Sequence, residues 1–135
     1  MVKQVLVDTN VFIHYSEGQK YALTFFSKAR YSSEVQIHVL KDVYAEARVM
    51  SLDFQKIYNL ITELQKCQIY HKVELEDSER EYAEELTQKC FEELGHAIDR
   101  TDRRIIAVAK MRKLEIFSKD KDLIRIARLE GIKTL

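Results

Sequence analysis

The stretch KQVLVDTNVFIHY, residues 3–15, decides the fold class and raises the question of function. Its short run of β-branched and aliphatic residues at 5–7 predicts a strand that is buried on both faces. The run stops abruptly at Asp8-Thr9-Asn10, after which an apolar helical pattern resumes. In open α/β sheets, ligands gather beyond the carboxyl ends of the strands, so this edge is the first place to look for a site.

The rest of the chain alternates between the same two patterns. Short apolar runs at 35–40, 114–117 and 132–135 predict three further strands. Between them, helical spacing marks several segments, including 54–64, where apolar residues recur at i, i+3, i+4 and i+7. Strands that alternate with helices favour a parallel sheet covered on both faces. We therefore expect an α/β protein, a three-layer α/β/α sandwich with a central parallel sheet of four to five strands.

Length and composition fit one folded domain over residues 1–135. The chain is 46% hydrophobic and 33% charged, with no proline and three glycines, and it contains no linker or repeat. No signal-peptide core and no apolar run of about 18 residues is present, so we expect a cytoplasmic protein without membrane contact. Two cysteines, Cys67 and Cys90, make neither a disulfide framework nor a zinc cluster. We expect both to be small buried side chains.

The formal net charge is zero, but the charges are unevenly distributed along the chain. Residues 74–93 contain nine acidic residues against two basic ones, whereas from Gly95 onward eleven basic residues face six acidic ones. Such asymmetry marks a polyanion-binding side in some proteins. In others it reflects two solvated helix faces of opposite sign. Charge alone leaves both interpretations open.

Four acidic residues stand at positions where acids are unusual. Asp8 and Asp120 each follow a predicted strand, where an ordinary role as helix N-cap is also available. Asp102 lies on the apolar face of its helix, with Asp99 one turn before it, and first-turn acids also favour the helix dipole. Glu46 lies in the middle of a helix on an apolar face, so capping does not explain it.

If these acids converge, their mutual repulsion is unfavourable unless a cation lies among them. Ligands that are all oxygen suit Mg²⁺ or Mn²⁺. The histidines do not compete for this role because they are scattered and lack a ligand spacing, and we interpret them as surface or locally hydrogen-bonded residues. They are His14, His38, His71 and His96.

Two other enzyme classes also place an aspartate after a strand. Phosphatases of the haloacid-dehalogenase type need a second aspartate two positions later as a general acid, and Asn10 cannot deliver a proton. Phospho-receiver domains need paired acids after the first strand and an aspartate after a middle strand. The segment VQIHVLKD supplies only Asp42, at the start of a helix.

Four segments together resemble the PIN-domain family of metal-dependent nucleases, and the resemblance covers nearly the whole chain. They are VLVDTNVFI, VLKDVYAEARV, DRTDRRIIAVAK and IFSKDKDLIRI. The resemblance implies that the catalytic, metal-binding acids are Asp8, Glu46, Asp102 and Asp120. It also implies supporting roles for Asn10, Ser118 and Asp99, with Asn10 holding a neighbouring carboxylate or a water.

The sequence departs from the family pattern at several positions. Ser118 stands where threonine is usual and keeps the hydroxyl group, and Leu123 replaces the usual phenylalanine. Arg103 and Arg104 follow Asp102 where the family often has small or apolar residues.

The resemblance implies a ribonuclease that uses Mg²⁺ or Mn²⁺ to hydrolyse single-stranded RNA. Basic residues near the acids would bind the RNA backbone: Lys41, Arg103, Arg104, Lys119 and Lys121. Small members of the family are often toxins with a small antitoxin partner, and others process ribosomal RNA. The apolar helix at 54–65 also suggests a homodimer. The alternative is a PIN-like module that binds RNA or protein without catalysis.

Overall fold

The structure is a computed structural model that describes residues 2–32 and 34–135. The first half of the chain contains β1 (Lys3–Val7), α1 (Thr9–Ser16), α2 (Lys20–Ser32), β2 (Val35–Leu40), α3 (Lys41–Met50) and α4 (Phe54–Lys66). The second half contains β3 (Tyr70–Val73), α5 (Asp77–Leu94), α6 (Arg100–Arg112), β4 (Glu115–Phe117) and α7 (Lys121–Leu129).

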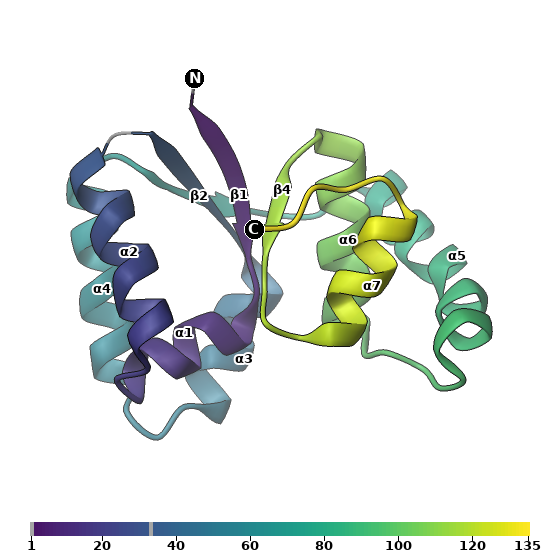
Figure 1. The fold of residues 1–135 in the computed structure, drawn as a ribbon, viewed down its shortest axis with the longest axis horizontal. Coiled ribbons are helices and arrows are strands. Elements are labelled where there is room, and N and C mark those ends of the chain that lie inside the picture. Colours follow the sequence, from purple (N-terminus) through teal and green to yellow (C-terminus); the bar gives the residue numbers. More distant parts are fainter. Residues whose placement is uncertain (1, 33) are drawn as a thin grey trace.

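The four strands form one parallel sheet in the order β3-β2-β1-β4. Helices α1 to α4 cover one face and helices α5 to α7 cover the other (Figure 1). The chain steps outward from β1 through β2 to β3, and then crosses the other face to reach β4 on the opposite side of β1. The strand order therefore reverses between β1 and β4, which is where such sheets form their binding crevice. The predicted three-layer α/β/α sandwich is confirmed.

Two strand predictions differ from the structure. The terminal segment 132–135 forms only a single bridge, between Thr134 and Ile116, instead of a strand. Strand β3 was not predicted because it lies at the edge of the sheet, where only Val73 of its four residues is buried. An edge strand has one neighbour and a partly solvated surface, so it needs no continuous apolar run.

The core lies on both faces of β1, whose residues 5–7 are completely buried. Helix α4 buries the side chains at 57, 60, 61 and 64 against the sheet, and it leaves Tyr58 half exposed. Cys90 is buried as expected, but the prediction for Cys67 was wrong, because its side chain is exposed. Cys67 follows the last turn of α4 as its C-cap, beyond the buried stripe.

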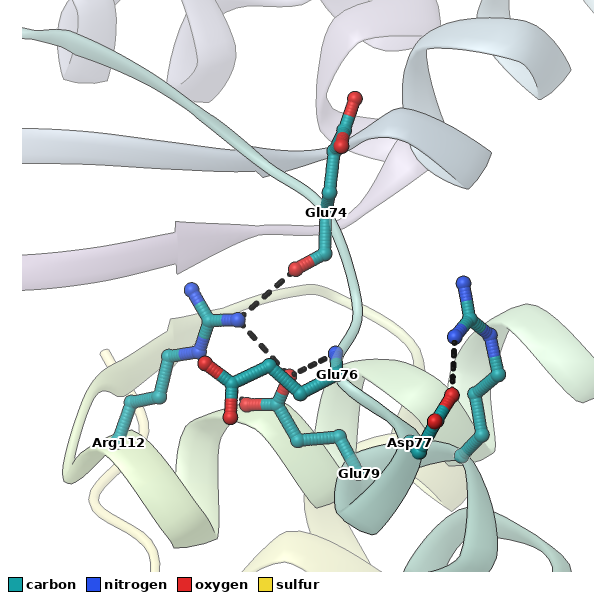
Figure 2. A network of polar contacts seen from close by, with 6 residues as sticks. Glu74, Glu76, Asp77, Glu79 and Arg112 are labelled. Carbon is teal, nitrogen blue, oxygen red and sulfur yellow. Dashed lines mark hydrogen bonds and ion pairs between the residues drawn. The ribbon is translucent and has the colours of Figure 1, made fainter.

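A polar network joins the start of α5 to the end of α6 (Figure 2). Arg112 donates from Nε and Nη2 to the Glu79 carboxylate, at 2.6 and 2.8 Å, and from Nη2 to the Glu74 carbonyl at 2.9 Å. Glu79 also closes a capping box with Glu76 at the start of α5. None of the helices in the described ranges is long and apolar enough to span a membrane.

Candidate active site at the carboxyl edge of the sheet

Asp8 lies at the point where β1 ends, and it is fixed on both of its oxygens. Its Oδ1 accepts a hydrogen bond from the backbone N–H of Thr9 at 2.7 Å, which caps α1. Its Oδ2 accepts a hydrogen bond from Ser118 Oγ at 2.8 Å, and only 3% of Asp8 is exposed. Since Ser118 follows β4, this bond connects the ends of the two strands between which the sheet order reverses.

Asp120 is attached to the same serine. Its backbone N–H donates to Ser118 Oγ at 3.0 Å. Its Oδ1 caps α7 by accepting from the backbone N–H groups of Asp122 and Leu123, at 2.9 and 3.1 Å. Asp120 is therefore the cap of α7, and its second carboxylate oxygen accepts no hydrogen bond from a described residue.

Glu46 extends to this edge from α3, and its carboxylate is held by Thr9, for which the sequence pattern indicated no role. Thr9 Oγ1 donates to Glu46 Oε1 at 2.8 Å, and Thr9 is itself buried. Asn10, for which we expected a supporting role, is half-buried, and its side chain makes no hydrogen bond within residues 2–32 and 34–135. The sequence shows the threonine in Asp-Thr-Asn but not its hydrogen-bond partner, because that partner depends on how α1 packs against α3.

Asp102 lies in the first turn of α6, and Asp99 caps that helix. Asp99 Oδ1 accepts the backbone N–H of Asp102 at 2.9 Å. The carboxylate of Asp102 is partly buried and accepts no hydrogen bond from any described residue. Its charge is therefore less well compensated than that of Asp8 or Asp120.

The pKa of Asp102 reports how close the acids lie to one another. Burial raises this pKa most, and the negative charges of Asp8, Asp99, Asp120 and Glu46 raise it further, to about 8. An ordinary aspartate has a pKa near 3.8. Because four other carboxylates act on Asp102, all five share one edge of the sheet.

Asp8 shows the same effect with partial compensation. Burial raises its pKa, the hydrogen bonds from Ser118 and Thr9 lower it, and the charges of Asp120 and Asp99 raise it again, to about 6. Two neighbouring carboxyl groups with raised pKa values are typical of functional sites, because structural acids are normally paired with cations.

No cation within the described residues forms an ion pair with any of these five acids. The same residues hold no group of three or more acidic, histidine or cysteine side chains already arranged to hold a metal ion. The four predicted ligands thus share one edge without forming a finished coordination sphere. Their carboxylate oxygens have the chemistry that Mg²⁺ or Mn²⁺ prefers.

The model of the PIN domain family matches residues 5–129.

The chain belongs to the PIN domain family.

PIN domains are generally nucleases, and the solved structures similar to this chain include a toxin–antitoxin complex. VapBC2 from Rickettsia felis, bound to a DNA fragment from its promoter, matches with a TM-score of 0.68 at 14% identity, covering 98% of this chain and 97% of that one. FitAcB from Neisseria gonorrhoeae matches with a TM-score of 0.66 at 17% identity, covering 97% and 96%.

A toxin–antitoxin complex from Klebsiella pneumoniae matches with a TM-score of 0.62 at 18% identity, covering 87% of this chain and 88% of that one. At these identities the structures are evidence for a shared fold alone. No curated protein sequence matches the chain.

Three of the predicted RNA-binding cations of this PIN domain are exposed near the acids. Lys41 is the first residue of α3, and Lys121 is the first residue of α7. Lys119 follows β4, with its ammonium group 5.0 Å from the centre of the Tyr21 ring. All three side chains are free of ion pairs within the described part of the chain.

The two predicted arginines turn toward the protein instead. Arg103 Nη1 donates to the carbonyl of Ile98 at 2.7 Å, and 13% of its side chain is exposed. Arg104 Nη1 donates to Asp42 Oδ2 at 2.5 Å, with 19% of each side chain exposed. Sequence spacing could not indicate the partner of Arg104, because Asp42 is far from it along the chain.

Proposed function

We propose that residues 1–135 act as one nuclease domain that hydrolyses phosphodiester bonds in single-stranded RNA. Asp8, Glu46, Asp102 and Asp120 would hold Mg²⁺ or Mn²⁺. The observation that supports this most strongly is that Ser118 and Thr9 connect Asp8, Asp120 and Glu46 at one edge of the sheet, while no cation of the described residues forms an ion pair with these acids or with Asp102. Such an arrangement destabilises the metal-free fold, so it is hard to explain by stability alone.

A bound divalent ion would neutralise charge on the phosphate and make a water molecule more acidic. The protein's own contribution is orientation. Ser118 and Thr9 limit the rotation of the Asp8 and Glu46 carboxylates, as supporting hydrogen bonds do around metal ligands. Asp102 is the group that we assign to accept a proton from the attacking water, because its carboxylate accepts no hydrogen bond from a described residue.

The exposed lysines would bind the RNA backbone. Lys41, Lys119 and Lys121 lie at the ends of elements that carry the acids, and their charges are available to phosphates. We assign Arg103 and Arg104 a smaller share of RNA binding, because both make contacts within the protein. Affinity that depends on phosphate contacts falls as salt rises.

The direct test is incubation of the purified protein with labelled single-stranded RNA. We expect cleavage with Mn²⁺ or Mg²⁺, no cleavage with excess chelator, and strong loss of cleavage in Asp102→Asn. Cleavage that persists in chelator would contradict the proposal. RNA binding without cleavage in any divalent ion would favour the alternative of a catalytically inactive PIN-like module.

We further propose that the protein works with protein partners. One similar structure is a toxin–antitoxin complex, which supports a toxin with a small antitoxin-like partner over an rRNA-processing nuclease. A groove of about 870 Å³ between α3, α4 and β3, with Val49 and Tyr58 exposed, offers surface for a partner or a second copy.

Co-purification of the native protein tests the antitoxin, and a ribosomal precursor in its place would favour the processing role. For the expected homodimer, light scattering at micromolar concentration should give twice the mass of the chain.

A further inference from the structure

The four acids come from both helical layers of the sandwich. Glu46 is carried by α3, which packs on α1, α4 and β2, whereas Asp102 is carried by α6, which packs on α5, α7 and β4. The two helices lie on opposite faces of the sheet (Figure 1). A metal ion held by both carboxylates therefore depends on how firmly the two layers are connected at this edge.

One ion pair joins a helix of each layer directly. Asp42 lies one turn before Glu46 on α3, and Arg104 lies two residues after Asp102 on α6. Arg104 Nη1 and Asp42 Oδ2 are 2.5 Å apart, and both side chains are mostly buried. Among the side-chain hydrogen bonds and ion pairs of the described residues, it is the one that joins a helix of the first layer to a helix of the second.

We propose that Asp42 and Arg104 are positioning residues, whose ion pair holds α3 and α6 at the separation that lets Glu46 and Asp102 share a metal ion. The inference rests on the proposed metal-dependent function. It assigns Arg104 chiefly to the geometry of the acidic site, and RNA contact is at most its minor role. A partly buried, charge-assisted hydrogen bond suits this role because it is strong and directional.

The proposal can be separated from a simple charge effect by the sign of its prediction. Arg104 is a cation close to the acids, so removing its charge alone should strengthen the binding of a divalent cation. Loss of the ion pair should instead weaken binding, since supporting contacts around metal ligands typically contribute about 10- to 100-fold in affinity. The two explanations thus predict opposite changes for Arg104→Gln.

The experiment is calorimetric titration of the full chain with Mn²⁺ at one fixed pH, with circular dichroism to confirm folding. We expect Arg104→Gln to bind Mn²⁺ about tenfold more weakly than the wild type. The double variant Asp42→Asn/Arg104→Gln has the wild-type net charge and should be weakened by about the same factor, because the two residues act through one contact. Arg104→Lys keeps a cation and a donor and should retain most of the affinity.

Arg80→Gln is the matched control. Arg80 forms an exposed ion pair with Asp77 within α5, at 3.1 Å, away from the acids. Its loss should leave Mn²⁺ affinity unchanged. Should Arg104→Gln fail to fold because Asp42 is left unpaired, the double variant carries the comparison, since a pure charge effect predicts little change in its Mn²⁺ affinity and loss of the ion pair predicts weaker binding.

The outcomes distinguish this inference from the proposed function. If the wild type does not bind Mn²⁺, or if Asp102→Asn binds it equally well, the metal site fails and the positioning role fails with it. If Asp102→Asn loses binding while Arg104→Gln binds as tightly as the wild type or more tightly, only the positioning role is overturned. Weaker binding of an uncleaved RNA by Arg104→Gln, at unchanged Mn²⁺ affinity, would return Arg104 to RNA contact.

Discussion

A buried carboxylate, Glu130, and a partly buried one, Asp102, have opposite surroundings in this PIN domain. Glu130, directly after α7, accepts hydrogen bonds from Tyr82, Lys89 and Lys110. Burial alone would raise the pKa of Glu130, but these three donors lower it to about 2. Asp102 is buried among other acids without such donors, and its pKa is about 8.

The difference separates a structural acid from one that we propose is functional. Tyr82 and Lys89 belong to α5 and Lys110 belongs to α6, so Glu130 connects three helices of one layer by satisfied contacts. The Glu79–Arg112 ion pair likewise connects the start of α5 to the end of α6 (Figure 2). The acids at the sheet edge lack such cations, and their repulsion becomes useful only when a cation binds.

The largest expected effect is on cleavage by Asp102→Asn. The substitution keeps the shape of the side chain but removes a metal ligand and the proposed proton acceptor. We expect kcat on single-stranded RNA to fall by about 1,000-fold or more, equivalent to about 4 kcal/mol in the activation barrier. Single-turnover cleavage assays with saturating Mn²⁺ measure it, and a loss below tenfold would remove Asp102 from the reaction.

Replacing the structural acid, Glu130, should lower the stability of the fold. Glu130→Gln leaves two lysines and a tyrosine without their shared acceptor, so the free energy of unfolding should fall by about 2 to 3 kcal/mol. We expect the lower part of that range because Lys89 and Lys110 are nearly half exposed. Urea denaturation measures the change. Glu63→Gln, in an exposed pair with Lys66, is the control and should change stability by about 0.5 kcal/mol or less.

The same change from carboxylate to amide should have the opposite effect on stability at the edge of the sheet. In metal-free protein at pH 7, Asp102→Asn should raise the free energy of unfolding by about 1 to 3 kcal/mol, because the folded wild type must keep Asp102 largely protonated at a pH where the unfolded chain ionises it. Mn²⁺ should stabilise the wild type more than the variant. An ordinary first-turn acid would instead lose about 0.3 to 1 kcal/mol on this substitution, so a lower melting temperature in chelator would break the comparison.

The pH dependence of stability should differ between the two regions. The folded pKa values of Asp8 and Asp102, about 6 and 8, lie above the ordinary value of 3.8, so their ionisation opposes folding. Their contribution to stability is fully present below pH 3.8 and is lost as the pH rises toward 8. Glu130, lowered from 4.5 to about 2, contributes above pH 4.5 and loses its contribution as the pH falls toward 2.

The melting temperature of chelator-treated protein should therefore fall as the pH rises from 4 to 8, and Asp102→Asn should reduce this fall. An identical pH profile for the wild type and the variant would contradict the assigned surroundings of Asp102.

The smallest expected effect comes from the hydroxyl group that holds Glu46. Thr9→Val keeps the β-branched shape but removes the hydrogen bond to Glu46 Oε1. We expect a loss of about 1 kcal/mol in stability or in Mn²⁺ binding. Thermal melts with chelator and with Mn²⁺ measure both. Thr24→Val, on the exposed side of α2, should change neither, and equal behaviour of the two variants would show that Thr9 does not support the site.

Much of the fold could be predicted from the sequence because burial repeats along the chain with the period of each element. The buried runs at β1 and β2 and the apolar stripe of α4 follow directly from local side-chain patterns. The edge strand β3 could not be predicted in this way. It is defined by pairing with β2, and its exposed residues carry no apolar period.

The sequence by itself singled out Asp8, Glu46, Asp102 and Asp120 as candidate site acids, because acids on apolar faces or after buried strands stand out from their neighbours. Only the tertiary structure decided which polar groups each acid meets. It gave Thr9 to Glu46, Ser118 to Asp8 and Asp120, and it paired Arg104 with Asp42. The physical reason is that burial is expressed in local periodicity, whereas the partner of a polar side chain depends on which distant segments meet when the two layers close on the sheet.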